Sequence, residues 1–187
     1  AALMRVDAGA YNPSEVLKTN VLGTENVCVA TCEAGVSHVV TLTSDKGVQP
    51  TNIYGTSKQF AEHLTVQANS YGYPQGTRHA CVRYGNVLGS RGSVLHIWRA
   101  AVAAGQPIRL TDARMTRFWL TLDMACDLVR YALTKMRGGE IFVPKLHAAK
   151  LQDIATALAG PDYPVEVTGL RPGGEKLHEV LLSPHEV

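Results

Sequence analysis

Hydrophobic and polar positions along the first 84 residues repeat with two different periods. Apolar residues at helical spacing run over 12–35 and stop at Gly35, a residue that suits a helix C-terminus. Asn12 is expected to cap this helix, with Pro13 in the first helical position. The stretch His38-Val39-Val40-Thr41-Leu42-Thr43 then predicts a buried strand.

The pattern continues with a polar loop over 44–52, a helix over 54–70 and a second strand over 77–84. Helix, strand, loop, helix and strand in this order are typical of a parallel α/β sheet. Ligands of such sheets bind beyond the carboxyl ends of the strands. The loops that follow the two strands are therefore expected to lie on one rim of the sheet.

After Tyr84 the pattern becomes mixed, beginning with an irregular glycine-rich stretch over 85–92. Further helices are expected near 93–104, 121–136 and 150–159 and from Glu175, and strands near 107–111, 117–120, 140–143 and 164–168. We therefore predict an α/β fold with two parts. Residues 1–85 form the C-terminal part of a parallel sheet, and residues 86–187 form a smaller mixed α/β lobe that binds substrate.

Composition narrows the class of protein. With 45% hydrophobic and 18% charged residues, the chain is typical of a soluble globular protein, and its net charge of +2 gives no reason to expect a nucleic-acid partner. No apolar run approaches the ~20 residues of a membrane span, and the first residues do not resemble a signal peptide. Buried reduced thiols are expected for Cys28, Cys32, Cys81 and Cys126, which favours the cytoplasm, and the scattered histidines predict no metal site.

Three side chains are placed for the oxidation of an alcohol. Tyr54 and Lys58 are four residues apart on a predicted helix, so they share a face. The ammonium group is expected to lower the pKa of the phenol from ~10, so that Tyr54 can take a proton from a substrate hydroxyl while hydride passes to a nicotinamide. Ser44, at the end of a strand, could hydrogen-bond the same hydroxyl. Tyr-x-x-x-Lys is common by chance, and the interpretation depends on its combination with Ser44.

Asp45 and Lys46 directly follow Ser44 and add a second kind of chemistry. Once a sugar carbinol has become a ketone, the hydrogen on the next carbon is acidic. A base can then remove this proton while an acid protonates the neighbouring hydroxyl, which leaves as water. A surface Asp-Lys pair is common, but a pair adjacent to the predicted catalytic serine favours an acid–base function.

The stretch from Arg83 to Arg117 is rich in arginine, with Asp112 as its one acidic residue. The planar guanidinium group suits phosphate, and a diphosphate is a plausible ligand. Arg117 and Arg171 are the better candidates, because Arg99 and Arg109 fit a solvated surface equally well. Asn86 and Ser93, near the predicted junction of the two parts, could bind phosphate or sugar.

Together these motifs resemble those of the extended short-chain dehydrogenase/reductases. More narrowly, the chain is similar to the UDP-N-acetylglucosamine 4,6-dehydratases of bacterial polysaccharide and flagellin-glycan biosynthesis. The resemblance runs nearly end to end. It includes Tyr11-Asn12-Pro13, Lys18-Thr19-Asn20-Val21, Ser44-Asp45-Lys46, Tyr54-Gly55-Thr56-Ser57-Lys58, Arg83-Tyr84-Gly85-Asn86-Val87, Met115-Thr116-Arg117-Phe118-Trp119 and Glu175-Lys176-Leu177-His178-Glu179.

The resemblance implies a Rossmann-like domain that binds NAD or NADP, with Tyr54 as the base for the C4 hydroxyl and Lys58 beside the nicotinamide. It implies Asp45 and Lys46 as the acid and base for loss of the C6 hydroxyl. Further cofactor contacts are implied for Ala2, Asn20 and Tyr84. A UDP-sugar is expected to contact Lys46, Asn86, Ser93, Arg117, Arg171 and Glu175. A homo-oligomer is also implied.

The resemblance further implies a longer protein of roughly 300 residues, in which a glycine-rich cofactor loop would precede Ala1. Two alternatives to a dehydratase stay open. A UDP-sugar epimerase of the same superfamily would use Tyr54 and Lys58 without acid–base work by Asp45 and Lys46. A non-catalytic remnant would bind a nucleotide sugar weakly without turnover, since a dinucleotide pyrophosphate normally binds on the glycine-rich loop.

Overall fold

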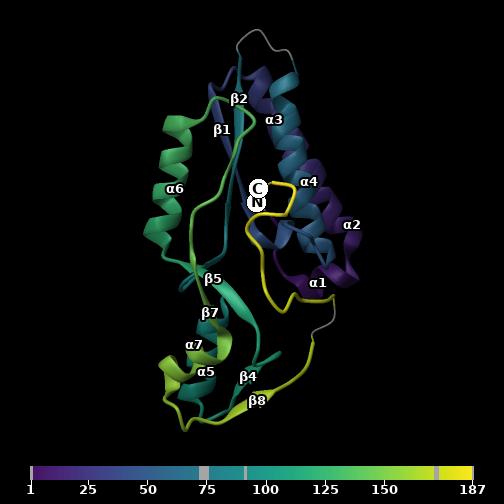
Figure 1. Cartoon of the computed structure of the whole chain (residues 1–187). Helices are drawn as coiled ribbons and strands as arrows, with labels where there is room; N and C mark the ends of the chain where they lie inside the picture. The colour runs from purple at the N-terminus through teal and green to yellow at the C-terminus, as the bar shows by residue number, and fades with distance from the viewer. Residues whose placement is uncertain (1, 72–75, 91, 171–172, 187) are drawn as a thin grey trace.

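The structure, a computed structural model, describes residues 2–71, 76–90, 92–170 and 173–186. Figure 1 shows an elongated molecule with a long sheet at one end and a smaller lobe at the other. In the described part of the chain, no helix is both long enough and apolar enough to cross a membrane.

The N-terminal helical region is broken into short pieces. It consists of α1 (Val6–Tyr11), α2 (Pro13–Val16), the π-helical turn η1 (Leu17–Leu22) and α3 (Gly23–Glu33). The predicted helix over 12–35 is therefore present from Pro13 to Glu33. The predicted cap was wrong, because Asn12 makes no side-chain cap bond and its Nδ2 donates to the carbonyl of Ala8 instead, at 2.9 Å.

The main sheet contains three parallel strands in the order β1, β2, β6, namely β1 (His38–Ser44), β2 (Arg78–Tyr84) and β6 (Ile141–Phe142). Ser44 is opposite Tyr84 in the register, so both strands end at the same rim, as predicted. The centre of β2 is fully buried, with Ala80, Cys81 and Val82 at 0% exposure.

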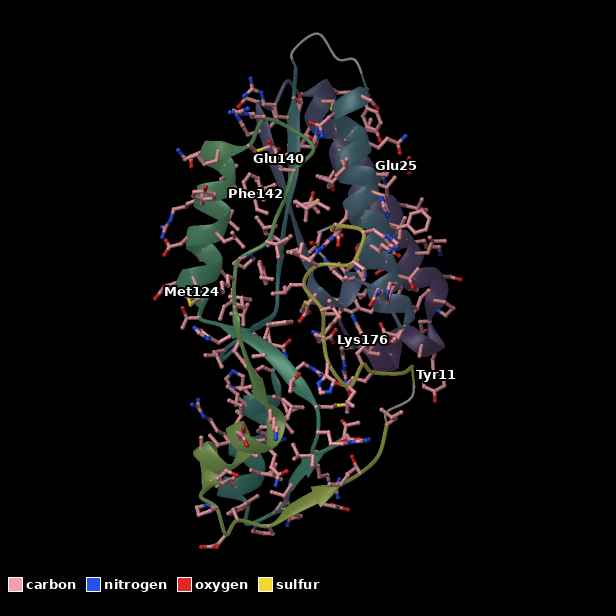
Figure 2. The ribbon with its side chains drawn as sticks, viewed as in Figure 1. Tyr11, Glu25, Met124, Glu140, Phe142 and Lys176 are labelled. Atoms are coloured by element: carbon pink, nitrogen blue, oxygen red, sulfur yellow. The ribbon has the colours of Figure 1, made fainter. Side chains whose placement is uncertain are left out.

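Helices cover both faces of this sheet. Figure 1 shows α3 and α4 (Ile53–Gln67) on one side and α6 (Leu122–Lys135) on the other. The short helical turn η3 (Ala68–Ser70) continues α4, which confirms the predicted helix over 54–70. Phe142 of β6 lies beside α6, where its ring meets Tyr131 edge-on at a centroid separation of 6.0 Å (Figure 2).

The smaller lobe is built around a separate apolar core. It contains α5 (Val94–Ala103), α7 (Leu151–Ala159) and a parallel pair of strands, β4 (Ile108–Leu110) and β8 (Val165–Val167). Its buried cluster consists of Trp98, Ile108, Leu110, Met115, Leu151 and Ala155. A third sheet, of β3 (Asn86–Val87), β5 (Thr116–Leu120) and β7 (His147–Lys150), lies between the lobe and the main sheet (Figure 1).

The chain crosses between the two parts more than once, because α6 and β6 follow residue 86 in sequence and yet pack on the main sheet. The division at residue 86 stays a prediction. Gly85, at this junction, allows a close crossing, since a Cβ atom there would lie 2.6 Å from the Cβ and the carbonyl oxygen of Phe118.

The predicted helix from Glu175 was wrong. In the structure, residues 173–186 contain no helix and run back from the smaller lobe to the rim of the main sheet (Figure 1). Part of this C-terminal segment pairs with β5, where the backbone N–H of Thr116 donates to the carbonyl of Leu177 at 3.1 Å. Several of its polar residues contact distant elements, such as Lys176 with Val48 and Glu186 with Arg83, and these contacts favour the extended form.

Cys28, Cys32 and Cys81 are buried and free, as predicted. Cys126 is exposed on α6, so the prediction of a buried thiol was wrong at that position.

Candidate active site

The rim of the main sheet carries a tight turn that holds three of the predicted catalytic residues. Ser44 ends β1, and Asp45 and Lys46 begin the 3-10 turn η2 (Asp45–Gly47). The hydroxyl of Ser44 donates to Asp45 Oδ1 at 2.9 Å and accepts from the backbone N–H of Lys46 at 3.4 Å. The turn therefore aligns the hydroxyl, the carboxylate and the ammonium group in a single hydrogen-bonded arrangement.

Asp45 is fully buried, and its two carboxylate oxygens differ. Oδ1 accepts from Ser44 and from Lys46 Nζ, the latter at 3.1 Å. Oδ2 has no hydrogen-bond partner among the described residues. Since buried polar atoms are nearly always satisfied, this oxygen is a candidate contact for a ligand.

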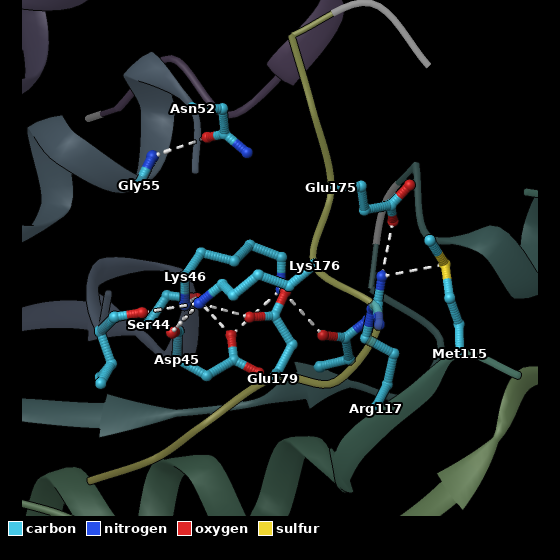
Figure 3. A network of polar contacts seen from close by, with 12 residues as sticks. Ser44, Asp45, Lys46, Asn52, Gly55, Met115, Arg117, Glu175, Lys176 and Glu179 are labelled. Atoms are coloured by element: carbon cyan, nitrogen blue, oxygen red, sulfur yellow. Dashed lines mark hydrogen bonds and ion pairs between the residues drawn. The ribbon is translucent and has the colours of Figure 1, made fainter. Parts of the chain in front are cut away.

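The ammonium group of Lys46 lies among oxygens from three segments of the chain. It donates to Asp45 Oδ1 and to Asn86 Oδ1 of β3, both at 3.1 Å, and lies 3.8 Å from Glu179 Oε1 of the C-terminal segment. Figure 3 shows Lys46 between Asp45 and Glu179. Asn86 was predicted to contact substrate, and the structure brings it to the catalytic turn.

Lys176 and Glu179 belong to this cluster, and the sequence analysis assigned them no function. Lys176 Nζ lies 2.8 Å from Glu179 Oε2 and donates to the carbonyls of Val48 at 2.7 Å and Asp45 at 3.2 Å. The one sequence signal for them was the motif Glu175-Lys176-Leu177-His178-Glu179, in which only Glu175 had been given a role.

The helix that carries Tyr54 and Lys58 begins directly after the loop that contains the turn. Asn52 caps α4 by accepting from the backbone N–H of Gly55 at 2.9 Å, and its amide also donates to the carbonyl of Gly174 (Figure 3). Lys58 Nζ donates to the carbonyl of Leu42 in β1 at 3.1 Å. Tyr54 and Lys58 are thus both fixed beside the rim.

The prediction that Lys58 lowers the pKa of Tyr54 was wrong for this chain by itself. Burial, followed by the charges of Asp45 and Tyr84, raises the pKa of Tyr54 to about 12. Burial also lowers the pKa of Lys58. Tyr54 is 8% exposed, so a phenolate there would be poorly solvated. The charged neighbours that raise this pKa come from β2 and η2, which a four-residue spacing on one helix does not reveal.

The other predicted cofactor residues lie in different settings. Asn20 is buried, and its amide forms two hydrogen bonds with the backbone of Leu3, at 2.8 and 3.0 Å, and one with Ser57 Oγ at 2.9 Å. Ala2, next to Leu3, and Tyr84, at the end of β2, are half-buried. Asn20 therefore holds the N-terminal backbone in place, and its contact with a cofactor stays a prediction.

The predicted phosphate and sugar contacts are only partly brought together. Arg117 is 3% exposed and pairs with Glu175, Nη2 to Oε1 at 2.8 Å. Ser93 precedes α5, and its Oγ is buried without a hydrogen-bond partner in the described part of the chain. Arg171 lies outside the described residues. Arg83, also in the arginine-rich stretch, is occupied by Glu62 and Glu186.

The whole chain, residues 1–187, matches the family model described as polysaccharide biosynthesis protein. The chain belongs to this family. It is 42% identical over 184 residues to a UDP-N-acetylglucosamine 4,6-dehydratase (inverting) of Campylobacter jejuni, covering 98% of this chain and 54% of the relative. A UDP-glucose 4-epimerase of Rickettsia akari is 39% identical over 191 residues, which cover 100% of this chain and 55% of that relative. The chain thus spans about half the length of these curated relatives.

Solved structures of proteins at different levels of sequence identity show the same fold. The X-ray structure of Pen from Bacillus thuringiensis matches with a TM-score of 0.92 and 37% identity, covering 100% of this chain and 59% of Pen. The dTDP-glucose 4,6-dehydratase DesIV of Streptomyces venezuelae, solved with NAD, matches with a TM-score of 0.84 at 22% identity, over 99% of this chain and 63% of DesIV. The predicted Rossmann-like α/β fold of the dehydrogenase/reductase type is confirmed.

Proposed function

We propose that this chain carries the catalytic turn and the sugar-binding lobe of a nucleotide-sugar 4,6-dehydratase that acts on a UDP-N-acetylglucosamine-like substrate. The observation that supports this most is the pair of buried Asp45 and half-buried Lys46, hydrogen-bonded to Ser44 at the rim beside Tyr54. Alcohol oxidation alone needs no second acid and base. A relative named as such a dehydratase, at 42% identity, supports the same function.

In the proposed first step, Tyr54 accepts the proton of the C4 hydroxyl, to which the Ser44 hydroxyl is hydrogen-bonded. Bound NAD or NADP would take the hydride from C4 and later return it to C6. The donor set fits this cofactor, because a phenol, an ammonium and a hydroxyl meet at the carboxyl end of β1. The raised pKa of Tyr54 requires a further positive charge nearby before it acts as a base at neutral pH, and oxidised nicotinamide carries such a charge.

In the second step, Asp45 and Lys46 act on the 4-keto sugar. One removes the C5 proton and the other protonates the C6 hydroxyl, which departs as water. A proton then returns to C5 as hydride returns to C6. The sugar thus loses one water in total, and its redox state is restored. Asp45 Oδ2, buried and without a partner in the described part of the chain, is the oxygen that we assign to the substrate.

Within this proposal, residues 1–85 face the cofactor and residues 86–187 face the nucleotide sugar. Asn86 lies next to the catalytic turn and would meet the sugar, while Ser93 and Arg117 would meet the diphosphate. Because Arg117 is buried and paired with Glu175, phosphate binding there would exchange one anionic partner for another. Arg171 and a homo-oligomeric state stay predictions.

The second candidate is a UDP-sugar epimerase, which the epimerase-named relative of Rickettsia akari favours.

The decisive experiment incubates the protein expressed from the complete reading frame with UDP-N-acetylglucosamine and NAD or NADP. A 4-keto-6-deoxy product, lighter by one water, supports the dehydratase; an epimer of unchanged mass supports the alternative. Asp45→Asn and Lys46→Met should each abolish water loss. Nucleotide binding without any product would leave only the non-catalytic alternative.

A further inference from the structure

Glu179 contacts the catalytic turn from the opposite end of the sequence. Its side chain is 2% exposed, and its carboxylate lies between two ammonium groups, with Oε2 2.8 Å from Lys176 Nζ and Oε1 3.8 Å from Lys46 Nζ. Figure 3 shows this arrangement, with Glu179 and Lys176 on the C-terminal segment and Lys46 on the turn.

The two lysines are held differently. Lys176 Nζ is fully engaged, because it donates to the carbonyls of Val48 and Asp45 in addition to its ion pair with Glu179. These bonds hold Lys176 on η2 and so bring Glu179 beside the turn, where its Oε2 is ion-paired but has no hydrogen-bond partner in the described part of the chain. Lys46 Nζ donates to Asp45 and Asn86, and its distance of 3.8 Å from Glu179 is that of an ion pair without a hydrogen bond. Lys46 is therefore held by two hydrogen bonds, and Glu179 adds an ion pair to it from the C-terminal segment.

The cluster contains two carboxylates and two ammonium groups, so its charges balance when all four groups are ionised. Asp45 and Glu179 carry the negative charges, and Lys46 and Lys176 carry the positive ones. An unpaired charge in such a buried place is strongly unfavourable. During the proposed water loss, Asp45 and Lys46 exchange protons with the sugar, so the attraction between them changes within each turnover. Glu179 supplies a second carboxylate beside Lys46.

We infer that Glu179 is a positioning residue that keeps the Lys46 ammonium group at the reacting sugar while Asp45 changes its protonation state. This inference rests on the proposed dehydratase function. Glu179 acts through Lys46 and touches neither sugar nor cofactor. Its effect belongs to the water-loss step, because in the described part of the chain Glu179 pairs with Lys46 and Lys176 and forms no hydrogen bond or ion pair with Ser44 or Tyr54, which serve the oxidation of C4.

The first test measures the position of Lys46 directly, on this chain and without turnover. The variant Glu179→Gln keeps the size of the side chain and removes its charge. Heteronuclear NMR of the lysine ammonium groups should show a protected Lys46 signal in the parent chain and its loss in Glu179→Gln. Glu186→Gln is the matched control, because it weakens another anchor of the same segment, the pair with Arg83, and should keep the signal. An unchanged Lys46 signal in Glu179→Gln would overturn the inference.

The second test uses the protein from the complete reading frame with UDP-N-acetylglucosamine. Glu179→Gln should lower kcat for water loss by about tenfold to a hundredfold with little change in KM. Because oxidation at C4 continues, the reduced nicotinamide should accumulate and be visible by its absorbance. Glu179→Asp, which restores the charge on a shorter side chain, should recover part of kcat.

Equal losses of activity in Glu179→Gln and Glu186→Gln, without accumulation of reduced cofactor, would show a merely structural role and refute the inference. If the unsubstituted protein forms no dehydrated sugar, the proposed function fails, and the NMR comparison still decides whether Glu179 holds Lys46. The two failures are therefore distinguishable.

Discussion

Residue 55 has to lack a side chain if the catalytic turn is to lie against α4. A Cβ atom at Gly55 would lie 2.3 Å from the carbonyl oxygen of Lys46 and 3.0 Å from Pro50 Cβ. The carbonyl belongs to backbone that the C-terminal segment also holds, so it cannot move aside cheaply. The position of Asp45 and Lys46 thus depends on this glycine.

We predict that Gly55→Ala destabilises the fold by about 2 kcal/mol or more and displaces η2. Chemical denaturation measures the loss of stability. Gly23→Ala is the control, since Gly23 is helical and a Cβ there would meet only the Lys18 carbonyl, at an ordinary 3.5 Å. That substitution should be neutral or stabilising by up to about 1 kcal/mol. Equal stability of the two variants would show that the turn has more room than these distances indicate.

The protonated state of Tyr54 can be measured through its effect on stability. The ordinary pKa of tyrosine is about 10, and in the folded chain it is raised to about 12. The contribution of this group is fully present below pH ~10 and is lost as the pH rises toward ~12, because the unfolded chain releases its proton first. The variant Tyr54→Phe has no phenol hydroxyl at this position, so its stability does not include this loss.

The free energy of unfolding of Tyr54→Phe, relative to that of the unsubstituted chain, should therefore rise by up to about 2 kcal/mol between pH ~10 and ~12. Denaturation of both proteins across this range measures the difference, from which the titrations of Cys81 and Tyr84 cancel because both proteins contain them. A difference that does not change with pH would contradict the raised pKa.

Among the elements, the C-terminal segment is tied down by a buried arginine. Arg83 of β2 is 3% exposed and binds Glu62 of α4 through two parallel hydrogen bonds, at 2.8 and 2.9 Å. The same guanidinium donates to Glu186, at 2.8 and 3.1 Å, and to the carbonyl of Leu181 at 2.8 Å. Arg83 thus joins three elements and has no donor left to spare for a phosphate.

This anchor should show in the acid stability of the chain. Arg83 holds the pKa of Glu186 at about 2, below its ordinary value of about 4.5. The pair contributes stability above pH ~4.5 and loses it as the pH falls toward ~2. Glu186→Gln should therefore be less stable than the parent at neutral pH, and the difference should shrink over this window.

Glu166→Gln provides the comparison for that experiment. Glu166 pairs with Arg109 at 3.1 Å on an exposed surface, where an ion pair contributes about 0–1 kcal/mol. Its loss should hardly change the denaturation midpoint. A similar small effect from Glu186→Gln at neutral pH would mean that the segment is held by its backbone contacts alone.

Local pattern could predict the elements that cover the main sheet, because their signals lie within a few residues. The strand over 38–43 and the helix over 54–70 are examples, and the Ser44–Lys46 part of the site followed from them. The predicted burial of the strand was wrong, because β1 lies at the edge of the sheet in the described part of the chain, is mostly half-buried and exposes Leu42. The contact between Lys176 and Val48 joins residues 128 positions apart, and no local pattern of hydrophobic and polar residues predicts it. The helix expected from Glu175 was wrong for the same reason, since the conformation of segment 173–186 is set by partners on β2, β5 and η2. Glu179 was missed with it.

At the scale of the whole molecule, one edge of the main sheet is open. In the described part of the chain, β1 pairs with β2 on one side and with no strand on the other. Leu42, near the end of β1, is 47% exposed, and further large apolar side chains are exposed on α1 and α6, such as Tyr11 and Met124 (Figure 2). An open edge with apolar side chains favours pairing with another chain.

We therefore predict that this chain self-associates and that Leu42→Lys reduces the association, because a charged side chain on an edge strand opposes pairing. Sedimentation velocity over a range of concentrations should show larger species for the parent and chiefly monomer for the variant. Ile97→Lys places the same charge at a 62% exposed position on α5, in the smaller lobe and away from β1, and should leave the association unchanged. If both lysines act equally, apolar surface in general drives the association rather than the edge of β1. A parent that stays monomeric throughout would show that β1 is protected by its twist or by side chains around it.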